Sequence, residues 1–139
     1  MSQRIFDGLL ECLAGRMGLD PAPLVAARML EVEGVAFRFD WHALDGEDVF
    51  VALCHFGPLQ AHADRQAQLA RLLEVNLFLV DSDIVTFFAI DRSTGDVMLC
   101  LRAPLASLGA DTCESAVIGA AAQAQAWRSG HYAMEPRLA

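Results

Sequence analysis

The chain has 139 residues, 55% of them hydrophobic, and a formal net charge of −8 at pH 7. The length suits one domain with a sizeable core, and the hydrophobic fraction exceeds the roughly 45–50% of typical globular proteins, which suggests apolar interface surface. The acidic balance argues against binding to nucleic acid or to an anionic membrane, because both need a basic footprint. No run approaches the ~18–20 apolar residues that span a bilayer, and the first residues lack a signal-peptide layout, so we expect a cytoplasmic protein.

The N-terminal part of the chain predicts a helix followed by a strand. Ser2 can cap a first helix that runs to about Met17 with apolar residues at helical spacing, and the segment Asp20–Pro23, which carries two prolines, ends this helix. The stretch 24–33 fits either a short helix or a strand that leads into a sheet. From Gly34 the sequence alternates strictly. The side chains that share one face of this strand are Val35, Phe37, Phe39 and Trp41.

Local signals predict the first hairpin and two further helices. Asp45-Gly46 is a strong signal for a tight turn, and it joins the alternating strand to a returning strand over 48–56. A second helix is predicted from about Ala63 to Asn76. A third helix is predicted to start at Asp111, where Asp-Thr-Cys-Glu has the form of a capping box, and to end at Ser129-Gly130.

A second hairpin lies between these two helices. Its strands are predicted at about 84–91 and 96–103, and Arg92–Gly95 supplies the turn because glycine adopts a positive φ at little cost. Both strands are apolar on both faces, whereas a small antiparallel sheet usually leaves one face polar and wet. We therefore expect another polypeptide to cover one face of the sheet.

The predicted order is helix–strand–strand–helix–strand–strand–helix. This order indicates an α+β fold in which helices pack on one face of an antiparallel sheet. One domain is expected over residues 1–130, followed by a mobile tail over 131–139, where no periodic pattern continues.

The central part of the chain also carries a family resemblance. It has two leucines and an asparagine at the end of a helix, a Thr-Gly turn between two strands, and a Pro-Leu pair after the second strand. The residues that carry the resemblance are Leu72, Leu73, Asn76, Asp91, Thr94, Gly95, Leu99, Pro104 and Leu105. This arrangement resembles the Tir-chaperone (CesT) family, whose members are small acidic chaperones of bacterial type III secretion effectors.

The resemblance implies a homodimeric, non-enzymatic chaperone that holds the N-terminal segment of an effector in extended form, without a nucleotide or other cofactor. In that family the second helix and the central hairpin contribute to the dimer, and the first helix and sheet surfaces contribute to effector docking. The dimer candidates implied here are Leu69, Leu72, Leu73, Phe87 and Met98. The partner-binding candidates are Ile5, Leu9, Phe37, Phe39, Phe50 and Val51.

Catalytic and metal-binding patterns are weak in this sequence. Phosphate-binding glycine loops and a Gly-x-Ser-x-Gly motif are absent. Cys54 and His55 with His62 and Asp64 are the best metal candidates, but adjacent strand residues point to opposite faces, so we expect no metal site. Asp81-Ser82-Asp83 fits a turn better than a carboxylate pair. The four widely spaced cysteines, which are expected to be small buried hydrophobes rather than disulfides or nucleophiles, are Cys12, Cys54, Cys100 and Cys113.

Two alternatives stay open from the sequence. The apolar strands of a small α+β domain could line an internal pocket, in which case the protein would be a ligand-binding domain or a small enzyme. That function needs polar groups that converge in the pocket, and the sequence shows no convincing set. A heterodimer with a related chaperone subunit is the other alternative to a homodimer.

Overall fold

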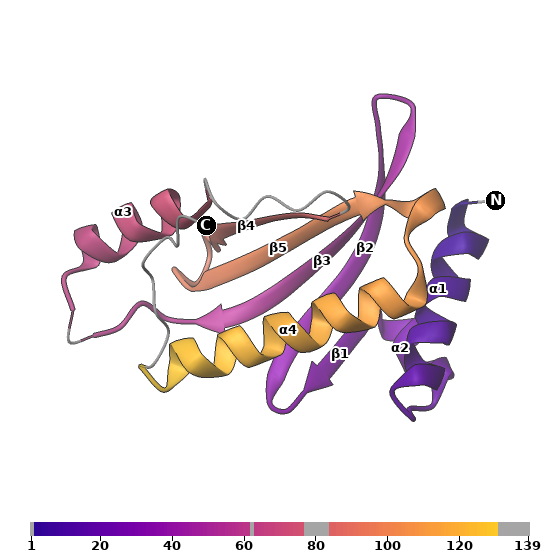
Figure 1. Cartoon of the computed structure of the whole chain (residues 1–139), viewed down its shortest axis with the longest axis horizontal. Helices are drawn as coiled ribbons and strands as arrows, with labels where there is room; N and C mark the ends of the chain where they lie inside the picture. Colours follow the sequence, from indigo (N-terminus) through magenta and orange to yellow (C-terminus); the bar gives the residue numbers. More distant parts are fainter. Residues whose placement is uncertain (1, 62, 77–83, 131–139) are drawn as a thin grey trace.

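The computed structural model describes residues 2–61, 63–76 and 84–130, which form four α-helices and a five-stranded antiparallel sheet (Figure 1). In chain order the elements are α1 (Ser2–Arg16), α2 (Pro21–Ala27), β1 (Met29–Val32), β2 (Val35–Leu44), β3 (Glu47–Gly57), α3 (Arg65–Asn76), β4 (Val85–Ile90), β5 (Val97–Pro104), a 3-10 turn (Leu105–Ser107) and α4 (Ala110–Arg128). The strands are ordered β1-β2-β3-β5-β4, so the two hairpins join through β3 and β5. The predicted α+β fold is confirmed.

The ambiguous stretch 24–33 contains both of the structures that its sequence allows. Asp20 caps α2, because its carboxylate accepts a hydrogen bond from the backbone N–H of Ala22 at 3.2 Å. Arg28 then takes a left-handed conformation with φ of 57°, and the following β1 pairs with β2. The sheet therefore has one strand more than predicted, with β1 and β4 at its edges.

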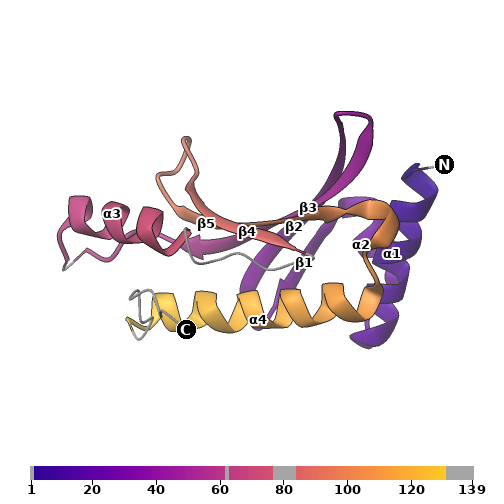
Figure 2. The same cartoon turned by 45° about the horizontal axis from the view of Figure 1, so that its top comes forward.

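The two faces of the sheet have different surroundings. α4 runs along one face and α1 packs at the end of that same face, whereas no helix of the described residues lies over the opposite face (Figure 2). The side chains buried beneath α1 and α4 include Val35, Phe37, Phe39, Phe50, Ala52, Cys54, Phe56 and Leu99. We call this side the covered face and the other side the open face.

Both predicted hairpin turns are confirmed. Asp45 and Gly46 have φ of 51° and 77°, and two consecutive positive φ values give the turn twist that suits a two-residue hairpin. In the second hairpin Gly95 has φ of 77°, and its N–H donates to the carbonyl oxygen of Asp91 at 2.7 Å. These turns fix the strand register, and the register decides which side chains reach the open face.

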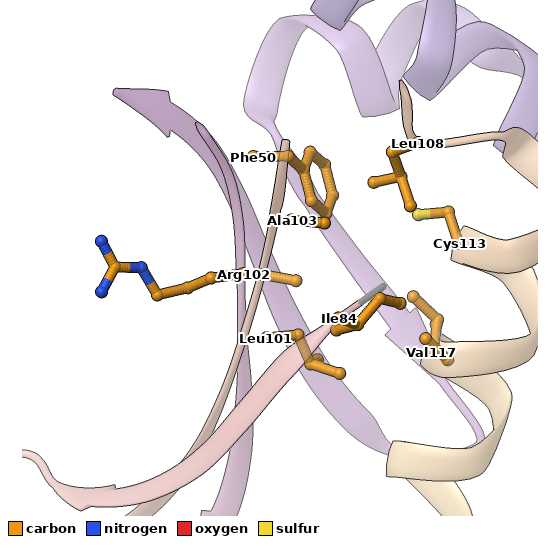
Figure 3. A pocket seen from close by; sticks show the side chains of 10 residues that line it. Phe50, Ile84, Leu101, Arg102, Ala103, Leu108, Cys113 and Val117 are labelled. Carbon is orange, nitrogen blue, oxygen red and sulfur yellow. The ribbon is translucent and has the colours of Figure 1, made fainter. Parts of the chain in front are cut away.

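A small apolar cavity lies between α4 and β5 on the covered face (Figure 3). Its volume of about 10 Å³ is about the space that one water molecule needs. Phe50, Leu101 and Val117 point into it, whereas the guanidinium of Arg102 points away toward the open face. The cavity has no room for a ligand, so the covered face is a packed core.

The start of α4 differs from the prediction. The helix begins at Ala110 and its N-cap is Gly109, so a capping box centred on Asp111 is wrong. The Asp111 carboxylate accepts from the adjacent N–H of Thr112 at 2.9 Å. Glu114 instead accepts from Nε of Arg16 at 3.1 Å, because α1 crosses close to this end of α4. Glu114, which the local motif predicted as part of the helix cap, therefore makes a long-range contact with α1 instead.

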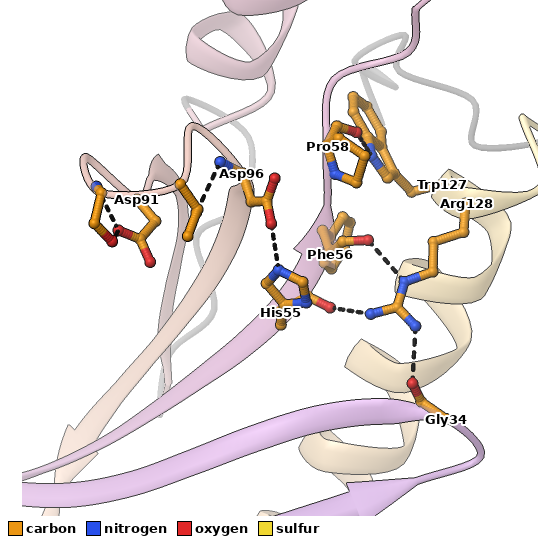
Figure 4. Close-up of polar contacts among 10 residues, drawn as sticks. Gly34, His55, Phe56, Pro58, Asp91, Asp96, Trp127 and Arg128 are labelled. Atoms are coloured by element: carbon orange, nitrogen blue, oxygen red, sulfur yellow. Dashed lines mark hydrogen bonds and ion pairs between the residues drawn. The ribbon is translucent and has the colours of Figure 1, made fainter.

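The other end of α4 is fastened to the sheet by its last residues (Figure 4). Arg128 donates to three backbone carbonyl oxygens: Nε to Phe56 at 2.9 Å, Nη1 to Gly34 at 2.8 Å and Nη2 to His55 at 2.7 Å. The indole N–H of Trp127 donates to the carbonyl oxygen of Pro58 at 3.0 Å. The helix ends after these residues, as predicted, and the tail 131–139 lies outside the described residues.

Candidate protein-interaction surfaces

An apolar groove runs between α3 and the edge strand β4. Its volume is about 280 Å³. The residues that line it are Leu69, Leu72, Leu73, Asn76, Phe88, Ala89 and Ile90. Leu72 is 4% exposed and fixes α3 against β4, whereas Leu73 on the next position is 71% exposed. A leucine this exposed beside a groove of apolar side chains indicates a surface that another chain can cover.

Asn76 closes the groove where α3 ends. Its side-chain oxygen accepts from the N–H of Phe88 at 2.6 Å, and its side-chain amide donates to the carbonyl oxygen of Phe88 at 3.1 Å. An asparagine offers both a donor and an acceptor, so it can replace one residue of a neighbouring strand at the free edge of β4. This contact explains why an asparagine follows the two leucines.

The beginning of α3 is held by a relay of two glutamines. Gln68 is buried, and its Oε1 accepts from the N–H of Gln60 at 2.7 Å while its Nε2 donates to the carbonyl oxygen of Gln60 at 2.9 Å. Nε2 of Gln60 donates to the carbonyl oxygen of Trp127 at 2.6 Å. The end of α4 therefore positions α3, and with it the groove, relative to the rest of the fold.

The open face is a second candidate surface, and most of its side chains are apolar. Strand register and alternating burial assign its outward residues. They are Arg38, Asp40 and His42 on β2, Val49, Val51, Leu53 and His55 on β3, Val85, Phe87 and Ala89 on β4, and Met98, Cys100 and Arg102 on β5. An apolar sheet face without a covering layer is the feature that a protein partner would bury.

The acidic groups that border this face already have partners. Arg28 donates to the Asp40 carboxylate at 3.0 Å, beside a hollow of about 460 Å³ that Val51 and Leu53 also line. Nε2 of His55 lies 2.7 Å from Oδ2 of Asp96 (Figure 4). Each of these carboxylates therefore already has a hydrogen-bond partner at the border of the apolar strip.

The predicted dimer candidates fall on two adjoining surfaces. Leu69, Leu72 and Leu73 line the groove, while Phe87 and Met98 project from β4 and β5 onto the open face. Ala89 links the two surfaces, because it lines the groove and pairs with Met98.

The predicted partner-binding candidates are mostly in the core of this chain. Phe37 and Phe39 are each 1% exposed, and Phe50 stacks on Phe39 with ring centroids 5.9 Å apart. Leu9 is also buried; Ile5 on α1 is 48% exposed and Val51 is half-buried on the open face. A partner-binding role for the buried rings stays a prediction. The open-face residues Arg38, Leu53 and Arg102 were not among the candidates, although alternation around Phe37 and Leu101 places them on the opposite face from these buried side chains.

The buried thiols and most of the candidate metal ligands lie among the described residues. Burial raises the pKa of the Cys54 and Cys113 thiols to about 12, so both stay protonated at neutral pH. Cys54 and His55 lie on opposite faces, as predicted, and no group of three metal-ligating side chains occurs among the described residues. His62 and Asp81–Asp83 lie outside that part of the chain. Within it, no helix is both long and apolar enough to cross a membrane.

Comparison with known families gives a match over most of the chain. A model described as the Tir chaperone protein (CesT) family matches residues 8–128. No curated protein sequence matches this chain.

Several solved chains share the fold. A chain of the HopA1–SchA chaperone–effector complex is 15% identical, with a TM-score of 0.61 over 93% of this chain and 97% of that one. A chain of the Yersinia pestis complex of the type III secretion chaperone SycH with a fragment of YscM2 is 18% identical, with a TM-score of 0.57 over 88% and 98%. A chain of the ExsC–ExsE complex is 20% identical, with a TM-score of 0.65 over 88% and 90%. At these identities the likeness concerns the fold alone.

Proposed function

This chain belongs to the Tir chaperone protein (CesT) family, and from that premise we propose that it binds a bacterial type III secretion effector. The observation that carries the proposal is the open face, an apolar sheet surface with no helix over it among the described residues. Such a surface is costly to leave in water and is typical of a protein-binding site. The chaperone would act in the bacterial cytoplasm and would keep the effector soluble and competent for secretion.

The bound effector segment is the N-terminal one, in extended form. An extended chain can pair its backbone with a free sheet edge while alternate side chains enter apolar pockets. β1 offers such an edge, and β4 offers one on either side of the position that Asn76 occupies. A folded domain could not reach edge and face together in this way.

The protein acts as a homodimer through the groove. Leu73 and the neighbouring Leu69 present apolar surface that the described part of the chain leaves uncovered. α3 extends away from the body of the fold beside β4 (Figure 1), a position in which a second subunit can pack against it. Homodimerisation would double the number of edges and faces offered to one effector.

The ligand-binding or enzymatic alternative has less support. The cavity beneath α4 is about the size of one water molecule and its lining is apolar. The two larger hollows described above are open surface grooves: the one beside α3 has a mainly apolar lining, and in the one over β2 and β3 the carboxylate of Asp40 is already paired with Arg28. The proposed function is therefore binding, with no chemical step.

Co-expression with effectors of the same type III system tests the proposal. We expect one full-length effector to co-purify with the chain, and the same effector without its N-terminal segment to be lost from the complex. Limited proteolysis should then protect a continuous N-terminal effector segment. An effector whose folded C-terminal domain binds just as well alone would contradict extended binding.

A further inference from the structure

Two arginines stand on either side of the apolar strip of the open face. Arg38 on β2 pairs across with Leu53, and Arg102 on β5 pairs across with Val51, so β3 separates the two guanidiniums. Neighbouring strands lie ~4.8 Å apart and residues rise ~3.4 Å along a strand, which places their Cα atoms about 12 Å apart. A partner that covers Val51 and Leu53 must pass between these two cations.

Neither arginine has an ion-pair partner in the described part of the chain. Arg16, Arg28 and Arg71 make ion pairs there, but Arg38 and Arg102 make none. This is unexpected in a protein with 18 acidic and 10 basic residues. Arg102 is half-buried among apolar neighbours. A docked partner without hydrogen-bond acceptors would remove water from its guanidinium without replacing the lost hydrogen bonds, which is unfavourable in free energy.

We propose that the open face binds an extended segment in which one apolar side chain is flanked by two carboxylates. The carboxylates pair with Arg38 and Arg102, and the apolar side chain packs on Val51 and Leu53. Guanidinium and carboxylate groups match in a two-bond geometry, which a lysine or an amide partner does not reproduce. The inference rests on the proposed function, because it specifies the chemistry of the segment that the chaperone binds.

The spacing of the arginines sets the spacing of the carboxylates. In an extended chain, residues i, i+2 and i+4 project to the same side and span about 13 Å, close to the separation of Arg38 and Arg102. The predicted pattern is therefore acidic, any, apolar, any, acidic. In a helix the same distance would take about eight residues. Two carboxylates four residues apart would therefore reach both arginines only if the segment is extended.

A second copy of this chain fits the open face poorly. Its own open face would bring the same two arginines, while the carboxylates nearby, Asp40 and Asp96, are already paired with Arg28 and His55. Two such faces would bring like-charged arginines together, and the nearby carboxylates already have partners on their own chain. The groove beside α3 lacks these arginines and remains the surface for self-association.

Synthetic peptides test the inference even while the effector is unidentified. The probes are peptides with the core Glu-Thr-Leu-Thr-Glu and matched Gln and Lys versions, titrated into the labelled full chain while the methyl signals of Val51 and Leu53 are followed by NMR. We expect the Glu peptide to shift these signals and to bind about ten-fold or more tightly than the Gln peptide, with the Lys peptide weakest. Equal binding of the three peptides, or no shift of these methyls, would overturn the proposal.

Charge variants complete the test. R38Q/R102Q should keep the fold by circular dichroism and lose the preference for Glu over Gln, whereas R65Q/R92Q, with the same change in net charge, should keep it. An altered sedimentation profile of R38Q/R102Q without a change in peptide preference would instead make this face a self-interface. If an effector co-purifies with the wild type and also with R38Q/R102Q, the proposed function stands and this inference fails.

Discussion

The covered and open faces of one sheet are built from the same strands but differ in what lies over them. On β3, Phe50, Ala52 and Cys54 disappear beneath the helices, while Val49, Val51 and Leu53 on the alternate positions stay half in water. Both sets are apolar, so hydrophobicity alone does not separate core from binding surface. The difference lies in which side the helices take, and the side with no helix over it among the described residues is the proposed binding surface.

The largest effect is expected from the covered face. Phe39→Ala should lower the free energy of unfolding by about 3–5 kcal/mol, because it leaves a hole between Phe37 and Phe50. The matched change Leu53→Ala on the open face should cost about 1 kcal/mol or less, because that side chain is already half in water. Urea denaturation followed by circular dichroism measures both. Equal losses would mean that the open face is as buried in solution as the core.

The groove offers a comparison between neighbouring leucines. Leu72→Asp should destabilise the protein by about 3 kcal/mol or more, because it places a carboxylate in the contact of α3 with β4. Leu73→Asp should leave the fold intact, since that side chain is 71% exposed, and should convert a dimer to a monomer. Sedimentation separates these outcomes. A wild-type protein that is monomeric at micromolar concentration would contradict the proposed homodimer.

The fastening of α4 should have a smaller effect. Arg128→Gln removes donors from three carbonyl oxygens at the ends of two strands and should cost about 2 kcal/mol. Arg92→Gln, an exposed arginine in the second turn, is the matched control and should change little. Thermal unfolding measures both variants. An unchanged melting temperature for Arg128→Gln would show that the remaining core alone positions α4.

Much of this fold could be predicted from local patterns. The helical spacing of α1 and α3, the alternation of β2 and the Asp45-Gly46 turn each depend on neighbouring residues, so their boundaries came close to those observed. The stretch 24–33 stayed ambiguous because a proline-rich helix start and a short strand follow each other within a few residues. The capping box at Asp111 failed because α1 contacts Glu114 from a distant part of the chain.

The proposed binding surface was harder to predict than the fold. Alternation places Phe37 and Phe39 on one side of β2 but does not say whether the helices pack on that side. Arg38 and Arg102 are 64 residues apart in sequence and share a surface because β5 inserts beside β3. Asn76 is part of the family motif, but the sequence does not show its role, which is to bond the backbone of Phe88 on an edge strand that only the tertiary structure brings to it.

The reaction rates of the four cysteines with a thiol reagent can probe both faces of the sheet without any substitution in the chain. Cys12 is exposed, Cys54 and Cys113 lie on the covered side, and Cys100 lies on the open face with 7% exposure. Burial raises the pKa of Cys100 while Arg102 lowers it, so its thiol should be easier to ionise than those beneath the helices. A thiol reagent at pH 8 should therefore modify Cys12 first, Cys100 next, and Cys54 and Cys113 only as the protein opens.

The same thiols give a pH dependence with a definite sign. Unfolded cysteines lose their protons near pH 9.0, while burial raises the pKa of Cys54 and Cys113 to about 12 in the folded chain. Below pH 9 both states keep these protons and stability does not depend on them; between pH 9 and about 12 only the unfolded state releases them, so stability should fall as the pH rises through this range. Cys54→Ala and Cys113→Ala should flatten this fall, whereas Cys12→Ala should leave it unchanged.

A bound effector should slow the labelling of Cys100 and leave the labelling of Cys12 unchanged if it covers the open face. Unchanged labelling of Cys100 in the complex would place the effector elsewhere, at the sheet edges or on α1 around Ile5.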